Sequence, residues 1–319
     1  DKNFFFESIF FGFIVASFII TLLHFFIKIN FYVIFLVFLS GFLCSVKKIE
    51  LTNFDFKKNY FYFVIFFVFV PIYLSQKYHE DFGFYHLPYV INLSNEKIIF
   101  GMANVNSAFI YNSIWLNLMA LFNFKDNFNF LTLPSFLLYV FFILFALKNI
   151  FNHQKYKGSQ YFLIVCLFYL ILKFTRISEF GTDFPATLFS LLAMFYFIRN
   201  FEITDSNDKI FNFYFVFCFT VFSILIKFSC IPLIILVIFN FFKDFKILNK
   251  EILKFKYIFI YVFVFLFFLQ QFIYSGCFIF PTEYTCFKTS WHDKEFLDMK
   301  GHIELINKSY SFASNEISK

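Results

Sequence analysis

The sequence has 319 residues, of which 60% are hydrophobic and only 15% are charged, and its mean hydropathy is +0.72. Soluble chains contain about 45–50% apolar and about 25% charged residues, and 65 phenylalanines are more than a water-soluble core of this length can bury. The composition therefore excludes a cytosolic enzyme, a disordered chain and a small disulfide-stabilised scaffold, and it predicts an all-α polytopic membrane protein.

Nine apolar segments are predicted to form transmembrane helices, because each approaches the roughly 20 residues that cross about 30 Å of hydrocarbon. In chain order they cover approximately residues 9–27, 31–46, 60–75, 130–147, 161–174, 185–199, 211–226, 229–242 and 257–274. Lys227 and Ser229 interrupt the apolar stretch between the seventh and eighth segments, which favours a tight hairpin over one long helix.

This pattern divides the chain into a transmembrane domain, residues 1–274, and a short extracytoplasmic tail, residues 275–319. The sequence begins with Asp1 and shows no cleavable signal pattern, so the first segment is expected to be a retained anchor. The last residues contain no closing pattern, which is compatible with a fragment of a longer protein in which the tail begins a truncated region.

Lysine and arginine are unevenly distributed between alternate loops. The richer set, with roughly twice as many cations, comprises the N-terminus and residues 47–59, 148–158, 199–210 and 243–256. The positive-inside rule makes this set cytoplasmic in a bacterial inner membrane. The extracytoplasmic segments are then 76–129, 175–184 and 275–319. The net charge of +6 thus reflects orientation, and nucleic acid is not an expected partner because no basic stripe with exposed aromatics is present.

Residues 107–122 form a further apolar stretch, but they include Asn112 and Asn117. Counting this stretch as a span would invert the lysine bias of every later loop. We therefore expect an interfacial helix that lies on the membrane, with Tyr111 and Trp115 at the level of the lipid headgroups.

The six cysteines fall into two groups. Four lie in predicted spans and should behave as small apolar residues: Cys44, Cys166, Cys218 and Cys230. Cys277 and Cys286 lie in the predicted outer tail, where a disulfide is expected if the compartment is oxidising. Two reduced thiols are the alternative.

The first polar cluster, residues 79–88, begins where the third apolar segment ends. If that helix continues, Asp81 and Tyr85 share a face, and Pro88 then turns the chain away. A carboxylate such as Asp81, beside Glu80, can act at the membrane surface as general base toward an acceptor hydroxyl. The alternative is a solvated loop with ordinary interface residues.

The same cluster contains His79, Asp81 and His86, which could hold a divalent cation such as Mg²⁺ or Mn²⁺. Their spacing fits no standard zinc motif, and hard cations prefer oxygen ligands. No metal site is therefore predicted firmly.

The second cluster, residues 101–107 and 111–115, combines amides, hydroxyls and aromatic rings. These groups suit sugar recognition, because rings stack on the apolar faces of pyranoses while amides bond to hydroxyl groups. Helix capping by Asn106 or Ser107, together with an interfacial aromatic belt, is the alternative.

The third cluster is the outer loop before the sixth apolar segment. Lys173 and Arg176 in this loop can hold a phosphate, whereas Asp183 or Thr182 can cap the next helix. Lys227, in the predicted outer hairpin, is another phosphate-binding candidate, and its alternative role is that of a lysine snorkelling to the interface.

No Walker loop, GxSxG or HExxH motif is present, so an ATP-driven pump or a soluble-type hydrolase is not supported. The pattern resembles the polytopic GT-C glycosyltransferases, which take a sugar from a polyprenyl-phosphate carrier on the non-cytoplasmic side. Glu80-Asp81 ahead of residues 107–122 is similar to the acidic residues and interfacial helices of the first outer loop in that family, although many members have paired aspartates. Residues 181–186 resemble the acidic-then-proline entry of a later span, and residues 226–229 resemble an outer-hairpin lysine. More narrowly, a bacterial GT-C-like set of unassigned function is similar at residues 81–88, 101–107, 111–115 and 275–281.

The resemblance implies a role for each candidate residue. Asp81 is the expected general base, and the groups that orient it or a metal ion are expected to be Glu80 or His86. The carrier phosphate is expected to be held by Lys173, Arg176 and Lys227. Further substrate contacts are expected from Tyr85, Asp183, Asn112 and Trp115, the last two shaping the sugar pocket. The expected reaction moves a sugar, with inversion, from a polyprenyl-phosphate carrier to a glycan, lipid or protein acceptor.

Two other functions are compatible with the sequence. A transporter or flippase of a lipid-linked or small substrate would place polar residues along a path inside the spans and often shows inverted repeats. A non-catalytic membrane subunit would tolerate the loss of Asp81 and Asp183. The spans contain few charges and no repeat, while the polar residues gather in outer loops, which favours chemistry at the membrane surface.

Overall fold

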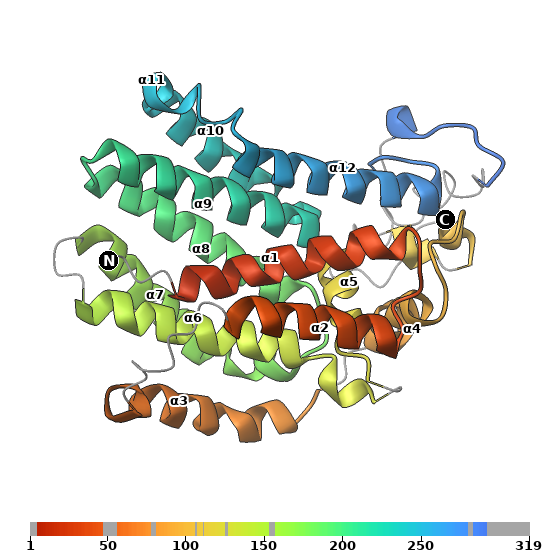
Figure 1. The fold of residues 1–319 in the computed structure, drawn as a ribbon, viewed down its shortest axis with the longest axis horizontal. Coiled ribbons are helices and arrows are strands. Elements are labelled where there is room, and N and C mark those ends of the chain that lie inside the picture. The colour runs from red at the N-terminus through yellow and green to blue at the C-terminus, as the bar shows by residue number, and fades with distance from the viewer. Residues whose placement is uncertain are drawn as a thin grey trace, which may run out of the picture.

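The computed structural model describes residues 5–46, 56–77, 81–105, 107–110, 112–124, 127–152, 157–279 and 283–291. Within these ranges the chain forms helices and no strand, apart from three isolated bridges. The all-α fold expected from the composition is confirmed, and Figure 1 shows it as a helical bundle.

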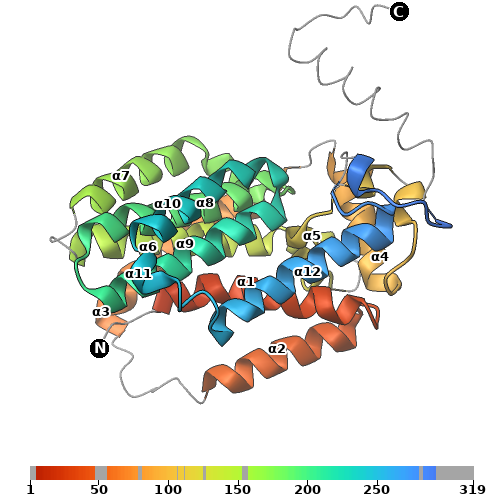
Figure 2. The ribbon, with the colours of Figure 1, turned by 90° about the horizontal axis from the view of Figure 1, so that it is seen from above.

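The helices that form the body of the bundle run side by side along the long axis of the molecule (Figures 1 and 2). They are α1 (Phe5–His24), α6 (Leu133–Asn152), α7 (Lys157–Leu172), α8 (Asp183–Glu202), α9 (Ser206–Ile226) and α12 (Phe255–Ser275). The helices α2 (Phe31–Val46) and α3 (Phe56–Leu74) lie at the periphery. Between α9 and α12 the chain forms α10 (Ile234–Lys243) and α11 (Phe245–Leu248).

One end of the bundle, which we call the loop end, carries the short helices α4 (Leu87–Asn95) and α5 (Ile114–Ala120). Backbone hydrogen bonds join its segments: Ile29 N–H donates to Leu93 O (2.9 Å), and Gly101 N–H donates to Ile273 O (2.9 Å). The loop end therefore joins described parts of the first predicted outer segment, residues 76–129, to the turn after α1 and to the end of α12.

The predicted number of nine spans is not met. Within the described residues, five helices are long and apolar enough to cross a membrane: Phe5–His24, Phe128–Phe151, Asp183–Glu202, Ser206–Ile226 and Phe255–Ser275. The other four predicted spans correspond to shorter apolar helices, Phe31–Cys44, Phe63–Leu74, Lys157–Leu172 and Phe228–Lys243. At 1.5 Å per residue, a helix of 16 residues such as α2 or α7 is about 24 Å long, less than the thickness of the hydrocarbon layer.

Large apolar side chains cover both the inside and the outside of the bundle. Inside, Phe145 packs edge-on against Phe10 and Phe195, with ring centroids 5.6 and 5.1 Å apart. Outside, the side chains of α2 and α3 expose rings such as Phe42 and Phe67. Because exposed apolar surface of this extent is unfavourable in water, it fits a protein that is surrounded by lipid.

Residues 107–122 do not form the expected interfacial helix. All seven residues of α5 are buried, and the helix packs against α1, α4 and α9. Tyr111, which was expected at headgroup level, lies outside the described residues. The polar side chains of this segment find partners on other helices, as described below, so the segment can enter the bundle.

The tail beyond α12 starts at Gly276, which takes the left-handed conformation (φ 78°) that ends the helix. Cys277 and Cys286 form a disulfide, which is one of the two alternatives that the sequence left open. Two backbone hydrogen bonds, Phe278 N–H to Thr285 O (3.1 Å) and Phe287 N–H to Gly276 O (3.0 Å), hold the two sides of this hairpin together.

Candidate functional site

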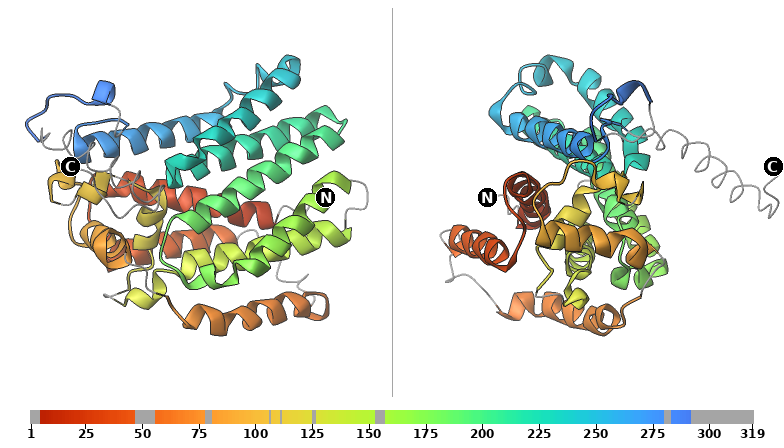
Figure 3. Two further views of the ribbon diagram at one scale, coloured as in Figure 1. Left: turned by 180° about the vertical axis from the view of Figure 1, so that it is seen from behind. Right: turned by 90° about the vertical axis from the view of Figure 1, so that its right-hand side faces the viewer.

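Two polar clusters that are distant in the sequence meet at the loop end. The backbone N–H of Lys77, just after α3, donates to the carbonyl of Ser178 over 3.2 Å. The ring of Phe82 packs against that of Phe180, with centroids 3.9 Å apart, and both rings are buried. These contacts fix the segment that carries Asp81 against the loop that precedes α8. The right-hand view in Figure 3 looks onto this end of the bundle.

Asp81 is half-buried and precedes a π-helical turn, Phe82–His86, in which Leu87 N–H donates to Phe82 O. Such turns are rare and occur frequently at functional sites. Tyr85 is half-buried, and its ring lies 4.1 Å from that of His86, which is buried. Of the two proposed catalytic residues that are described here, Asp81 and His86, Asp81 is therefore the more accessible.

Pro88 does not turn the chain away as the sequence suggested. The π-helical turn continues directly into α4, with Pro88 in its first turn. Proline is tolerated there because the first N–H groups of a helix have no intrahelical partner.

Two members of the first cluster, Glu80 and His79, lie outside the described residues. Among the residues that are described, no group of three His, Cys, Asp or Glu side chains is placed to hold a metal ion. The contribution of Glu80 and the metal-binding role of His79 thus stay predictions.

Two of the three cations assigned to the carrier phosphate form ion pairs. Lys227 pairs with Asp183 at the start of α8, and Arg176 Nη1 lies 2.6 Å from Glu179 Oε2. Lys173, at the end of α7, is exposed. Asp183 occupies the first turn of α8, where a carboxylate is favourable to the helix dipole, and Thr182 provides no side-chain cap.

Asn112 belongs to a buried hydrogen-bond network rather than to an open pocket. Its Oδ1 lies 2.7 Å from the Tyr89 hydroxyl, and its Nδ2 donates to Gln270 Oε1 over 3.3 Å. Burial raises the pKa of Tyr89 well above its usual value, so the phenol stays protonated and can donate. The network extends over α1, α4, α5 and α12 through buried side chains, namely Thr21, His24, Asn117 and Tyr274.

Trp115 is also buried, in contrast to the expected position at the headgroups. Its indole Nε1–H donates to Ser135 Oγ over 3.3 Å, and its ring lies 5.9 Å from that of Phe13. Ser113 caps α5 by accepting from Trp115 N–H, and its own hydroxyl donates to Ile226 O. The sequence indicated capping by Ser107 or Asn106, and it missed Ser113.

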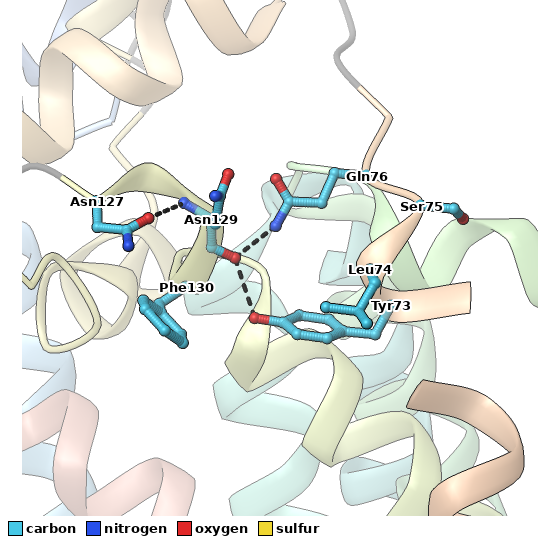
Figure 4. Close-up of a pocket in the computed structure, with 7 residues that line it drawn as sticks. All are labelled: Tyr73, Leu74, Ser75, Gln76, Asn127, Asn129 and Phe130. Atoms are coloured by element: carbon cyan, nitrogen blue, oxygen red, sulfur yellow. Dashed lines mark hydrogen bonds between the residues drawn. The ribbon is translucent and has the colours of Figure 1, made fainter. Parts of the chain in front are cut away.

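The sequence also gave no indication of a cavity beside the end of α3. The cavity has a volume of about 600 Å³ and lies between residues 73–76 and 127–130 (Figure 4). The predicted clusters include none of these residues, because the two walls are distant in the sequence and meet only in the fold.

Comparisons with known proteins give one result. A family model described as "Domain of unknown function (DUF8201)" matches residues 1–318. No curated protein and no solved structure matches the chain. Because the family model covers almost the whole chain, the chain belongs to the DUF8201 family.

Proposed function

We propose that this chain is an integral-membrane glycosyltransferase that moves a sugar from a polyprenyl-phosphate carrier to a glycan, lipid or protein acceptor. Asp81 is the proposed general base. The observation that supports the proposal is the contact between Phe82 and Phe180. It brings the Asp81 segment and the cation-bearing loop before α8 to the same end of the bundle, as a single site requires.

In the proposed reaction the acceptor hydroxyl oxygen forms a bond to the anomeric carbon of the donor sugar. The bond from that carbon to the carrier phosphate oxygen breaks, and its electron pair stays with the phosphate. The hydroxyl proton passes to the Asp81 carboxylate. Attack from the face opposite the leaving phosphate inverts the anomeric carbon.

The leaving phosphate requires nearby positive charge, since negative charge grows on it as the bond breaks. Lys173, Arg176 and Lys227 are the proposed sources. Exposed ion pairs contribute only about 0–1 kcal/mol, so a phosphate can displace Asp183 from Lys227 at little cost. The pair between Arg176 and Glu179 is half-buried.

The loop end is proposed to face the extracytoplasmic side of a bacterial inner membrane, with the N-terminus in the cytoplasm. The lysine-bearing segments 199–210 and 243–256, which the structure describes at the opposite end of the bundle, support this orientation. The disulfide Cys277–Cys286 at the loop end also supports it, because disulfides persist in oxidising compartments.

The test is sugar transfer in proteoliposomes that contain the purified protein and a panel of polyprenyl-phosphate hexoses and pentoses labelled in the sugar. Asp81→Asn should lower the turnover about 100-fold or more, because a general base contributes typically 10²–10⁴-fold. Glu96→Gln, which removes an exposed carboxylate at the same end, is the matched control. Turnover near the wild-type value in Asp81→Asn would exclude Asp81 as the base.

A second candidate is a transporter or flippase of a lipid-linked substrate. The buried network around Asn117 and Gln270 favours it, because it places polar groups inside the bundle. Transfer of a labelled lipid-linked sugar across vesicles that lack any acceptor, with the sugar still attached to its carrier, distinguishes this function from glycosyl transfer.

A further inference from the structure

The cavity beside the end of α3 has a lining suited to sugars. Its walls are two short segments, residues 73–76 and 127–130, and its volume is about 600 Å³, within the range of about 300–1,000 Å³ for small-molecule sites. We propose that this cavity, rather than the buried pair Asn112 and Trp115, binds a neutral sugar unit of the substrate. The proposal rests on the function proposed above and assigns the place of its sugar.

Hydrogen bonds within the walls hold the cavity in shape. The Tyr73 hydroxyl donates to the backbone carbonyl of Asn129 over 3.0 Å, and Gln76 Nε2 donates to the same oxygen. Asn127 Oδ1 accepts from Asn129 N–H over 3.2 Å. Tyr73 is anchored in turn, because its ring packs against Phe136 at 4.9 Å. A site formed in advance in this way loses less conformational entropy on binding.

The groups left facing the cavity are those that recognise a sugar. The backbone carbonyl of Asn129 accepts the hydrogen bonds within the wall, whereas the side-chain amide of Asn129 is exposed. This amide can donate to one sugar hydroxyl and accept from another. Figure 4 shows the side chain of Gln76 reaching toward Asn129, to whose carbonyl its Nε2 donates. Phe130, which is 39% exposed, supplies an aromatic ring for the apolar face of a pyranose.

The lining also discriminates against charged ligands. Among the described residues that line the cavity, none is an Asp, Glu, Lys or Arg. A phosphate or a cation would lose hydration here without gaining a charged partner. A neutral polyhydroxylated group replaces its water contacts with amide contacts, so its binding is favoured.

The position of the cavity fits the proposed reaction. Gln76 directly precedes Lys77, whose backbone is bonded to Ser178 in the cation-bearing loop. Asp81 follows five residues after Gln76, and a chain of that length reaches at most about 18 Å. A sugar in the cavity therefore lies on the same side of the bundle as the proposed base and the proposed phosphate site.

The experiment measures the equilibrium binding of tritiated decyl glucoside, galactoside and mannoside to the protein in phospholipid nanodiscs. Decyl phosphate serves as the sugar-free competitor. At least one glycoside should bind saturably, and decyl phosphate should not displace it. The double variant Asn129→Ala/Phe130→Ala should raise its Kd about tenfold or more, since it removes amide and ring contacts.

The matched controls are Asn95→Ala and Phe26→Ala, which remove an exposed amide and an exposed ring at the loop end but outside the cavity. They should leave the Kd unchanged. An unchanged Kd in the cavity variant, the absence of saturable binding, or equal displacement by decyl phosphate would each overturn the proposal.

Sugar-transfer assays on the same variants separate this proposal from the proposed function. Binding at the cavity without any transfer refutes the glycosyltransferase and retains the sugar site. Transfer that depends on Asp81 but is unaffected in Asn129→Ala/Phe130→Ala refutes the sugar site and retains the enzyme.

Discussion

Asp183, the first residue of α8, forms an ion pair with Lys227, the residue that directly follows α9. The two helices are antiparallel neighbours in the bundle, so the pair closes their shared end. The Asp183 side chain is 64% exposed and the Lys227 side chain 42% exposed, and solvent weakens such a pair. The pair can therefore open for a competing phosphate without destabilising the bundle.

Lys227→Gln should lower the rate of sugar transfer about 10- to 100-fold, because a hydrogen bond to a charged group contributes about 1.5–3 kcal/mol. Asp183→Asn should leave the affinity for the donor unchanged or raise it, since it releases Lys227 from its carboxylate. Lys28→Gln, which removes an exposed cation of the loop end, is the control. Equal losses in the Asp183 and Lys227 variants would instead indicate that Asp183 itself contacts the substrate.

Asn117→Leu should destabilise the protein by about 1–3 kcal/mol, the cost of leaving buried polar groups without partners. Asn117 Nδ2 lies 3.0 Å from Thr21 Oγ1 and 3.0 Å from Gln270 Oε1, and its Oδ1 lies 3.0 Å from the Tyr89 hydroxyl. Thermal unfolding in detergent measures the loss, with the exposed variant Asn95→Leu as control. A Tm equal to that of the wild type would show that the network contributes nothing to stability.

Trp115→Ala should cost about 3–5 kcal/mol of stability, as for other large buried side chains. Trp115→Phe should cost far less, because it keeps most of the contact with Phe13 and loses mainly the bond to Ser135. Sugar transfer by Trp115→Phe, measured below its Tm, should be close to that of the wild type. A selective loss of donor affinity in this variant would restore the sugar-pocket role that the sequence suggested.

The disulfide predicts a simple labelling pattern. In denaturant without reductant, maleimide should modify only the four free cysteines, Cys44, Cys166, Cys218 and Cys230. After reduction it should also modify Cys277 and Cys286. Mass spectrometry of protein purified from membranes counts the labels. Modification of all six thiols before reduction would show that the tail is in a reducing compartment, against the proposed orientation.

The sequence determined the fold class and the approximate positions of the helices. Runs of Phe, Ile and Leu fix helix positions, because a backbone in lipid must satisfy its own hydrogen bonds. The turn at Lys227 and the pairing of Cys277 with Cys286 were also predictable, since each is local. The lengths of the helices were less predictable from the sequence. Pro232 lies in a 3₁₀ segment, and the regular helix α10 starts only after it, at Ile234, so α10 is shorter than the predicted span.

Only the tertiary structure decided which polar residues are buried and which face a cavity. Asn112 and Trp115 resemble surface residues in the sequence, but their partners Gln270 and Ser135 lie on other helices, and these bonds satisfy them inside the bundle. Conversely, Asn129 becomes part of a cavity because its carbonyl accepts from Tyr73, 56 residues earlier. A local pattern records how apolar a segment is, whereas burial of a polar group depends on a partner that is distant in the chain.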